Sequence, residues 1–258
     1  MPITPARMPL MDHLGELRRR LTIVVVSVFV TAIVVYFATP ALIEVLTNPI
    51  REFLTGGTLT VLSVLGGFSI RFKVAFFFAF IICTPIIIWE IMAFFLPALN
   101  EKERRWVVPT VAAMVFLFFF GMIFCYFIIL NTAFGWLIQQ STEFAATLNE
   151  AEDYLSIIIM FEVGFGIAFQ LPLVIFYLAI LHLVPYKILR EQWRYVYVGL
   201  LVLSAVVTPD ASPVTMALMF AALILLYEVA LGVARSVIVA KDGKAALKWT
   251  REEYANRD

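Results

Sequence analysis

The chain has 258 residues, of which 62% are hydrophobic and 15% are charged. This proportion leaves too little polar surface to cover a water-soluble globule of this size, so the composition predicts an integral membrane protein. Its 19 basic and 19 acidic residues cancel to a formal net charge of zero, which argues against bulk attraction to nucleic acid. Cys83 and Cys125 both fall inside apolar runs, where a thiol behaves as a small hydrophobic group.

Apolar stretches of membrane length recur along the chain. A bilayer core is about 30 Å thick and needs roughly 20 helical residues to cross it. Six stretches meet or approach that length, and we predict spans at 21–38, 72–95, 106–134, 154–181, 193–207 and 213–233. We therefore expect an all-α, six-span membrane domain over residues 1–235, followed by a tail at 236–258.

Prolines and charges shape these predicted spans. Pro85 and Pro172 each remove a backbone hydrogen bond and are expected to bend their helices, which gives either a curved wall of helices or kinks that serve packing alone. The apolar run of the fifth span covers only about 18 Å, and that of the sixth stops at Glu228. Two short helices would thin the bilayer, although ordinary helices with snorkelling charged ends are the alternative.

The connection between the first two spans contains two prolines and two Gly-Gly pairs. This turn chemistry argues against a continuous helix. We expect an ordered cap outside the membrane there, with a short helix near residues 42–53.

The basic residues are distributed unevenly between the two sides of the predicted spans. All of them except Arg51, Arg71 and Lys73 fall in the N-terminal arm, the second and fourth connections, or the tail. The third connection, by contrast, carries four acidic residues and no basic one. Because Lys and Arg accumulate on the cytoplasmic side, both termini are predicted to be cytoplasmic.

Two predicted cytoplasmic segments combine acids and bases beside an apolar stretch. In "DHLGELRRRL" at residues 12–21, the three arginines act as positive-inside anchors, but Glu16 weakens that signal. In "FFLPALNEKERRW" at residues 94–106, Glu103 precedes a pair of arginines. If the two segments fold together, their acids form a pocket that suits a basic peptide, since carboxylates accept bidentate guanidinium groups. Solvated surface charge is the alternative.

Five short motifs occur in order along the chain. They are "HLGELRRRL" from His13, "FFLPALNEKERR" from Phe94, "FGIAFQLP" from Phe165, "TPD" at residues 208–210 and "LLYE" ending at Glu228. Together they touch five of the six predicted spans, and as a set they resemble the TatC family, the multi-spanning receptor subunit of the twin-arginine protein translocase.

The resemblance implies specific roles for several residues. Glu16 and Glu103 match the family's acids that would accept the two guanidinium groups of a signal peptide. Four further residues would complete that surface: Arg18, Leu99, Arg104 and Arg105. Pro49 and Asp210 are similar to positions that the family uses for integrity or assembly on the outer side.

Three polar residues in the predicted spans are candidates for a function within the membrane. The family's fourth span often carries a Glu where this chain has Gln170, so a mechanism that needs ionisation there does not apply directly. Glu162 lies eight residues earlier, and we hypothesise that it forms with Gln170 a polar notch facing a partner helix or an incoming signal; for Gln170, an interhelical hydrogen bond is the alternative. Glu228 is a candidate for a paired polar function, with a snorkelling acid as the alternative.

These features predict the signal-peptide receptor and core subunit of the translocase, located in the cytoplasmic (inner) membrane. The resemblance implies single-span partners, TatA and TatB, in an oligomeric complex that moves folded proteins with the energy of the proton gradient. We expect no enzymatic activity, no catalytic residues, no metal and no cofactor, since neither a phosphate-binding loop nor a metal-ligand spacing occurs.

Two other classes of protein are alternatives to this prediction. A proton-coupled small-solute transporter would use Glu162, Gln170 and Glu228, but we see no internal repeat of the kind that many transporters carry. An intramembrane enzyme would need a Ser-His or Asp-Asp arrangement at membrane depth, and the sequence offers none.

Overall fold

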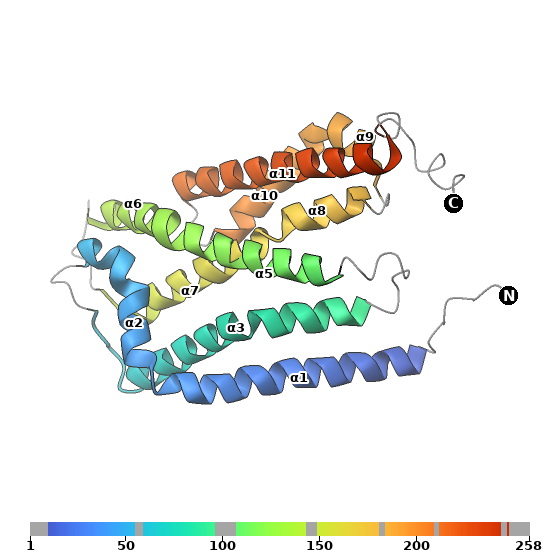
Figure 1. Ribbon diagram of the computed structural model, residues 1–258. Helices are drawn as coiled ribbons and strands as arrows, with labels where there is room; N and C mark the ends of the chain where they lie inside the picture. The colour runs from blue at the N-terminus through green and yellow to red at the C-terminus, as the bar shows by residue number, and fades with distance from the viewer. Residues whose placement is uncertain are drawn as a thin grey trace. The chain divides into compact units, whose positions relative to one another are not determined.

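The computed structural model describes residues 10–54, 59–95, 107–142, 149–180, 184–208, 212–243 and 247. Over these ranges the chain is helical, and its β pairing is limited to one isolated bridge between Thr60 and Glu150. Five helical runs are long and apolar enough to cross a membrane: Leu14–Tyr36, Gly66–Phe94, Val107–Gln140, Ala151–Ile180 and Pro213–Ala240. The prediction of an all-α membrane protein is confirmed (Figure 1).

The helices belong to two compact units. The first contains Met1–Asn48, Leu59–Phe116 and Asn149–Leu155, and the second contains Pro49–Thr58, Leu117–Leu148 and Ser156–Asp258. The first unit is built on α1 (Leu10–Tyr36) and α3 (Gly66–Phe95), which lie side by side in Figure 1. The shorter α2 (Thr39–Thr47) follows α1 and also contacts α3.

Side-chain contacts show that α1 and α3 run antiparallel. Near the beginning of α1, Arg20 bonds to Glu90 close to the end of α3. Near the end of α1, the ring of Tyr36 packs against Phe72 close to the beginning of α3, with centroids 5.6 Å apart. This arrangement brings the N-terminal end of α1 beside the C-terminal end of α3.

Backbone hydrogen bonds close the opposite end of the first unit. The N–H of Thr60 donates to the carbonyl of Asn149 at 2.8 Å, and the N–H of Ala151 donates to the carbonyl of Thr60 at 2.8 Å. Glu152, in the first turn of α7 (Ala151–Ala168), accepts from Lys73 at 3.3 Å. The first long connection is therefore tied to the start of α7.

A continuous helical run joins α5 (Val107–Phe124) to α6 (Leu130–Thr142) through a π-helical turn, η4 (Cys125–Ile129). The next run is interrupted between α7 and α8 (Leu171–Ile180). Pro172 explains the break, because it has no N–H to donate to the carbonyl four residues earlier. The N–H of Gln170 instead donates three residues back, to Ile167. The predicted bend at Pro172 is confirmed as a break, whereas α3 continues through Pro85 as one helix.

The last helices differ greatly in length. After α9 (Tyr186–Glu191), α10 (Trp193–Val207) has 15 residues, or about 22 Å, which confirms a short fifth helix. The prediction of a short sixth helix is wrong, because α11 (Pro213–Asp242) has 30 residues. The apolar run stops at Glu228, but α11 continues past this residue, whose carboxylate accepts hydrogen bonds from Arg190 and Tyr197.

The short helix predicted in the first connection has two parts. It consists of α2 followed by a 3-10 turn, η1 (Asn48–Phe53). Pro40 lies in the first turn of α2, where its missing N–H leaves no hydrogen bond unmade and its fixed φ suits the helix.

Candidate functional site

Arg20 joins two carboxylates on neighbouring helices of the first unit. Its Nε and Nη2 donate to Oε1 of Glu16 at 3.0 and 2.6 Å, and its Nη1 donates to Oε2 of Glu90 at 2.8 Å. The exposed fractions of the three side chains are 23% for Arg20, 22% for Glu16 and 14% for Glu90. These short, charge-assisted bonds use the planar fork of donors that distinguishes a guanidinium group from an ammonium group.

The local sequence explains how the cluster forms. Glu16 and Arg20 are four residues apart on α1, so they share one helix face. Glu90 lies near the end of α3, which the antiparallel packing places beside the start of α1. We call Glu16, Arg20 and Glu90 the acidic–arginine cluster.

The predicted signal-binding residues divide between described and undescribed parts of the chain. Glu16 belongs to the cluster, and Arg18 is exposed on α1. Leu99, Glu103, Arg104 and Arg105 lie outside the described residues. The pocket between Glu16 and Glu103 therefore remains a prediction.

From the sequence alone, Arg20 is interpreted as a topological anchor and Glu90 is not singled out as a site residue. The i, i+4 spacing of Glu16 and Arg20 was a visible signal for their pairing. The bond between Arg20 and Glu90 cannot be recognised from local spacing. It follows only if α1 and α3 are neighbouring antiparallel helices, because the end of α3 then lies beside the start of α1.

A second polar cluster surrounds Glu228 in the second unit. Arg190 Nη1 donates to both carboxylate oxygens of Glu228, at 3.1 and 2.9 Å, and the hydroxyl of Tyr197 donates at 2.9 Å. The hydroxyl of the neighbouring Tyr227 donates to the carbonyl of Leu189 at 2.8 Å. These bonds connect α9, α10 and α11, so Glu228 is a paired residue rather than a solitary snorkelling acid.

The two polar residues of the fourth span have different surroundings. Glu162 is 3% exposed, and within the described ranges its Oε1 has no hydrogen-bond partner. Gln170 is partly exposed at the break between α7 and α8, and its Nε2 lies 3.5 Å from the carbonyl oxygen of Gly166. The polar notch formed by Glu162 and Gln170 remains a prediction.

The two residues predicted for the outer side also differ in what can be described. Pro49 is partly buried in η1, next to the fully buried Ile50. Asp210 lies outside the described residues.

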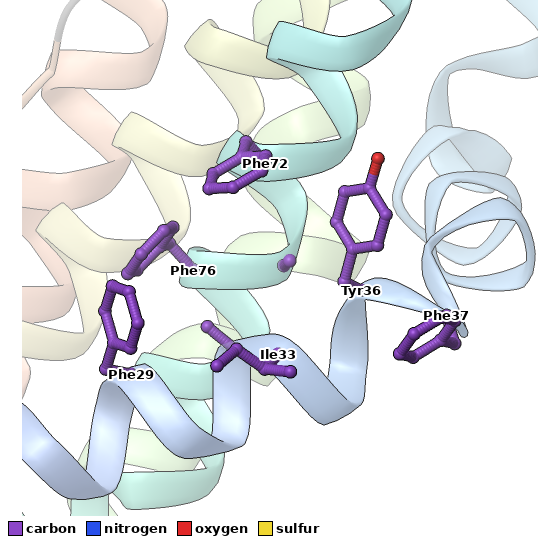
Figure 2. A pocket seen from close by; sticks show the side chains of 8 residues that line it. Phe29, Ile33, Tyr36, Phe37, Phe72 and Phe76 are labelled. Carbon is purple, nitrogen blue, oxygen red and sulfur yellow. The ribbon is translucent and has the colours of Figure 1, made fainter.

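An apolar pocket opens between α1 and α3, with a volume of about 190 Å³. Figure 2 shows Phe29 and Ile33 of α1 beside Phe76 and Phe72 of α3, and the hydroxyl of Tyr36 pointing away from α1. The lining offers no charged side chain. No group of three or more His, Cys, Asp or Glu residues suited to a metal ion occurs within the part of the chain that the structure describes.

Long apolar helices with charged clusters near their ends define a polytopic helical membrane protein. The family described as "Sec-independent protein translocase protein (TatC)" matches residues 12–221. The chain therefore belongs to the TatC family.

Individual relatives agree with this assignment. The Deinococcus radiodurans protein named Sec-independent protein translocase protein TatC is 33% identical over 234 residues, covering 89% of this chain and 87% of the relative. The Escherichia coli K12 protein of that name is 33% identical over 202 residues and covers 78% of each chain. The Aquifex aeolicus protein is 32% identical over 226 residues, covering 87% of this chain and 93% of its own.

The fold agrees as well. A crystal structure titled "Twin Arginine Translocase Receptor- TatC" has a TM-score of 0.71 and 30% identity, and the match covers 86% of this chain and 98% of the other. A second crystal structure of that receptor, in DDM, has a TM-score of 0.73 at 29% identity and covers 86% and 99% of the two chains. These likenesses favour a translocase subunit over the small-solute transporter.

Proposed function

We propose that this chain is the receptor subunit of a twin-arginine translocase and binds the signal peptides of folded cargo proteins. The observation that carries the proposal is the contact between Glu16 and a guanidinium group. That carboxylate already receives two N–H bonds from Arg20 at 3.0 and 2.6 Å. An acid placed to bind one guanidinium group is suited to bind those of a signal peptide.

In this proposal, Glu16 and Glu103 accept the paired arginines of the signal. Each carboxylate has two oxygens and matches the fork of a guanidinium group, whereas a lysine offers a single charged point. Four residues complete the surface: Arg18, Leu99, Arg104 and Arg105. The receptor therefore distinguishes Arg-Arg from Lys-Lys by geometry as well as charge.

The protein acts as an assembly platform rather than as an enzyme. Single-span partners, TatA and TatB, join it in an oligomeric complex in the inner membrane, with both of its termini in the cytoplasm and the proton gradient as the energy source. Pro49 and Asp210 support integrity or assembly on the outer side. Because α10 is about 22 Å long against a bilayer core of about 30 Å, it favours local thinning of the membrane.

The test is site-specific crosslinking of an Arg-Arg signal peptide to the purified full-length protein. Glu16→Gln and Glu103→Gln should each reduce crosslinking strongly, and a Lys-Lys peptide should crosslink weakly to the unchanged protein. Glu152→Gln is the matched control, since it removes an acid that pairs with Lys73 elsewhere in the first unit. Equal crosslinking of both peptides to all variants would contradict the proposal.

A further inference from the structure

We propose that Glu16 and Glu90 form a guanidinium-binding site whose resident side chain, Arg20, exchanges with an arginine of the signal peptide. This inference rests on the proposed function. It adds Glu90 as a further acceptor for the signal, and it makes Arg20 an internal competitor rather than only a topological anchor.

The contacts of Arg20 show that the site fits a guanidinium group. Three N–H groups of Arg20 reach two carboxylates from two different helices, at 2.6 to 3.0 Å. The acids are thereby held at the separation that one planar guanidinium spans. A lysine ammonium group lacks this fork and cannot reproduce the three bonds in the same geometry.

The charge of the acidic–arginine cluster favours a further cation. Glu16 and Glu90 together carry two negative charges, and Arg20 supplies one positive charge. Arg20 uses only Oε1 of Glu16 and only Oε2 of Glu90. Among the described residues, the other oxygen of each carboxylate accepts no hydrogen bond. Each carboxylate therefore keeps one oxygen that can accept a bond from an incoming guanidinium group while Arg20 is still bound.

Arg20 is also placed to leave. Its side chain is 23% exposed, and it lies on the predicted cytoplasmic side at the start of an apolar run. A long arginine side chain in such a place can extend its charged end into water or the headgroup region. An arginine of the signal peptide would re-form the same charge-assisted bonds with the two carboxylates, so exchanging one arginine for the other leaves neither acid unpaired.

A resident competitor lowers the apparent affinity for the signal. If Arg20 holds the two carboxylates in about nine-tenths of the molecules, the apparent dissociation constant is about tenfold weaker than that of the open site. Removing Arg20 should therefore tighten binding of an Arg-Arg peptide, even though it removes a contact seen in the resting protein.

The experiment measures binding of a fluorescent Arg-Arg signal peptide to the full-length protein in lipid nanodiscs. Arg20→Gln should bind about tenfold more tightly. Arg19→Gln is the matched control, because it removes the neighbouring exposed arginine and the same charge; it should bind like the unchanged protein. Glu90→Gln should weaken binding. Arg20→Lys keeps the charge and should tighten binding to a smaller extent, because an ammonium group competes less well.

The outcomes separate this inference from the proposed function. If the unchanged protein does not prefer Arg-Arg over Lys-Lys peptide, the proposed function fails and this inference fails with it. If that preference is present but Arg20→Gln and Arg20→Lys bind no more tightly than Arg19→Gln, the exchange is refuted alone. Unchanged affinity in Glu90→Gln would remove Glu90 from the site.

Discussion

Gly121 allows α5 to approach the helical run of α7 and α8 closely, and its substitution gives a quantitative test of the packing. A Cβ atom added at this position would lie 2.9 Å from the carbonyl oxygen of Phe165 and 2.8 Å from Cγ of Phe169. The first of these neighbours is backbone and cannot rotate away. Gly121→Ala should therefore push the two helices apart.

The matched control is Gly232→Ala in α11, where an added Cβ would meet nothing within 4 Å. Both substitutions gain the same helix propensity, so the difference between them isolates the clash at Gly121. Overpacking of this kind costs about 1–3 kcal/mol. At about 2–4 °C per kcal/mol for a chain of this size, Gly121→Ala should melt roughly 2–12 °C below Gly232→Ala.

The two cysteines of the protein allow the melting temperature to be measured with a thiol-reactive dye. Cys83 and Cys125 are free and buried, so a maleimide dye that fluoresces on reacting with thiols reports unfolding in detergent. Equal melting temperatures for the two variants would refute the close approach of the helices at Gly121.

Three further substitutions can be followed in the same melting assay. Tyr227→Phe removes the buried hydroxyl that donates to Leu189 at 2.8 Å and should cost about 1–2 kcal/mol; an unchanged melting temperature would mean that the carbonyl has another donor. Glu162→Leu removes a buried carboxyl oxygen without a hydrogen-bond partner among the described residues and should raise the melting temperature, so a clear fall would contradict this reading of Glu162. Glu152→Gln removes the charge that pairs with Lys73 but keeps an oxygen that can accept from the Ser69 hydroxyl. Because the side chains of Glu152 and Lys73 are 38% and 35% exposed, the change should cost less than about 1 kcal/mol, and a larger loss would contradict a weak surface pair.

Much of the fold can be predicted from residue patterns within one or two helical turns. Membrane-length apolar runs predict the long helices, and the missing N–H of Pro172 predicts the break after α7. α10 occupies the residues predicted for the fifth span. These features depend on neighbours within one or two helical turns, so they can be derived without knowing how the helices pack.

The features that sequence reasoning missed depend on tertiary contacts. Glu228 looked like the end of an apolar span, but Arg190 and Tyr197 satisfy its carboxylate and α11 continues past it. Arg20 looked like an anchor because its partner Glu90 is distant in sequence and close only in the antiparallel hairpin. The role of a charged side chain therefore depends on the partner that a neighbouring helix supplies, and local sequence does not reveal that partner.

The most direct test of the central claim is export of a folded reporter protein in a bacterial strain that lacks its own member of this family and carries the partner subunits. The account predicts that supplying this chain exports a reporter with an Arg-Arg signal, and that a Lys-Lys signal or Glu16→Gln in the receptor reduces export strongly. Export that does not depend on this chain, or that is equal for Arg-Arg and Lys-Lys signals, would contradict the account.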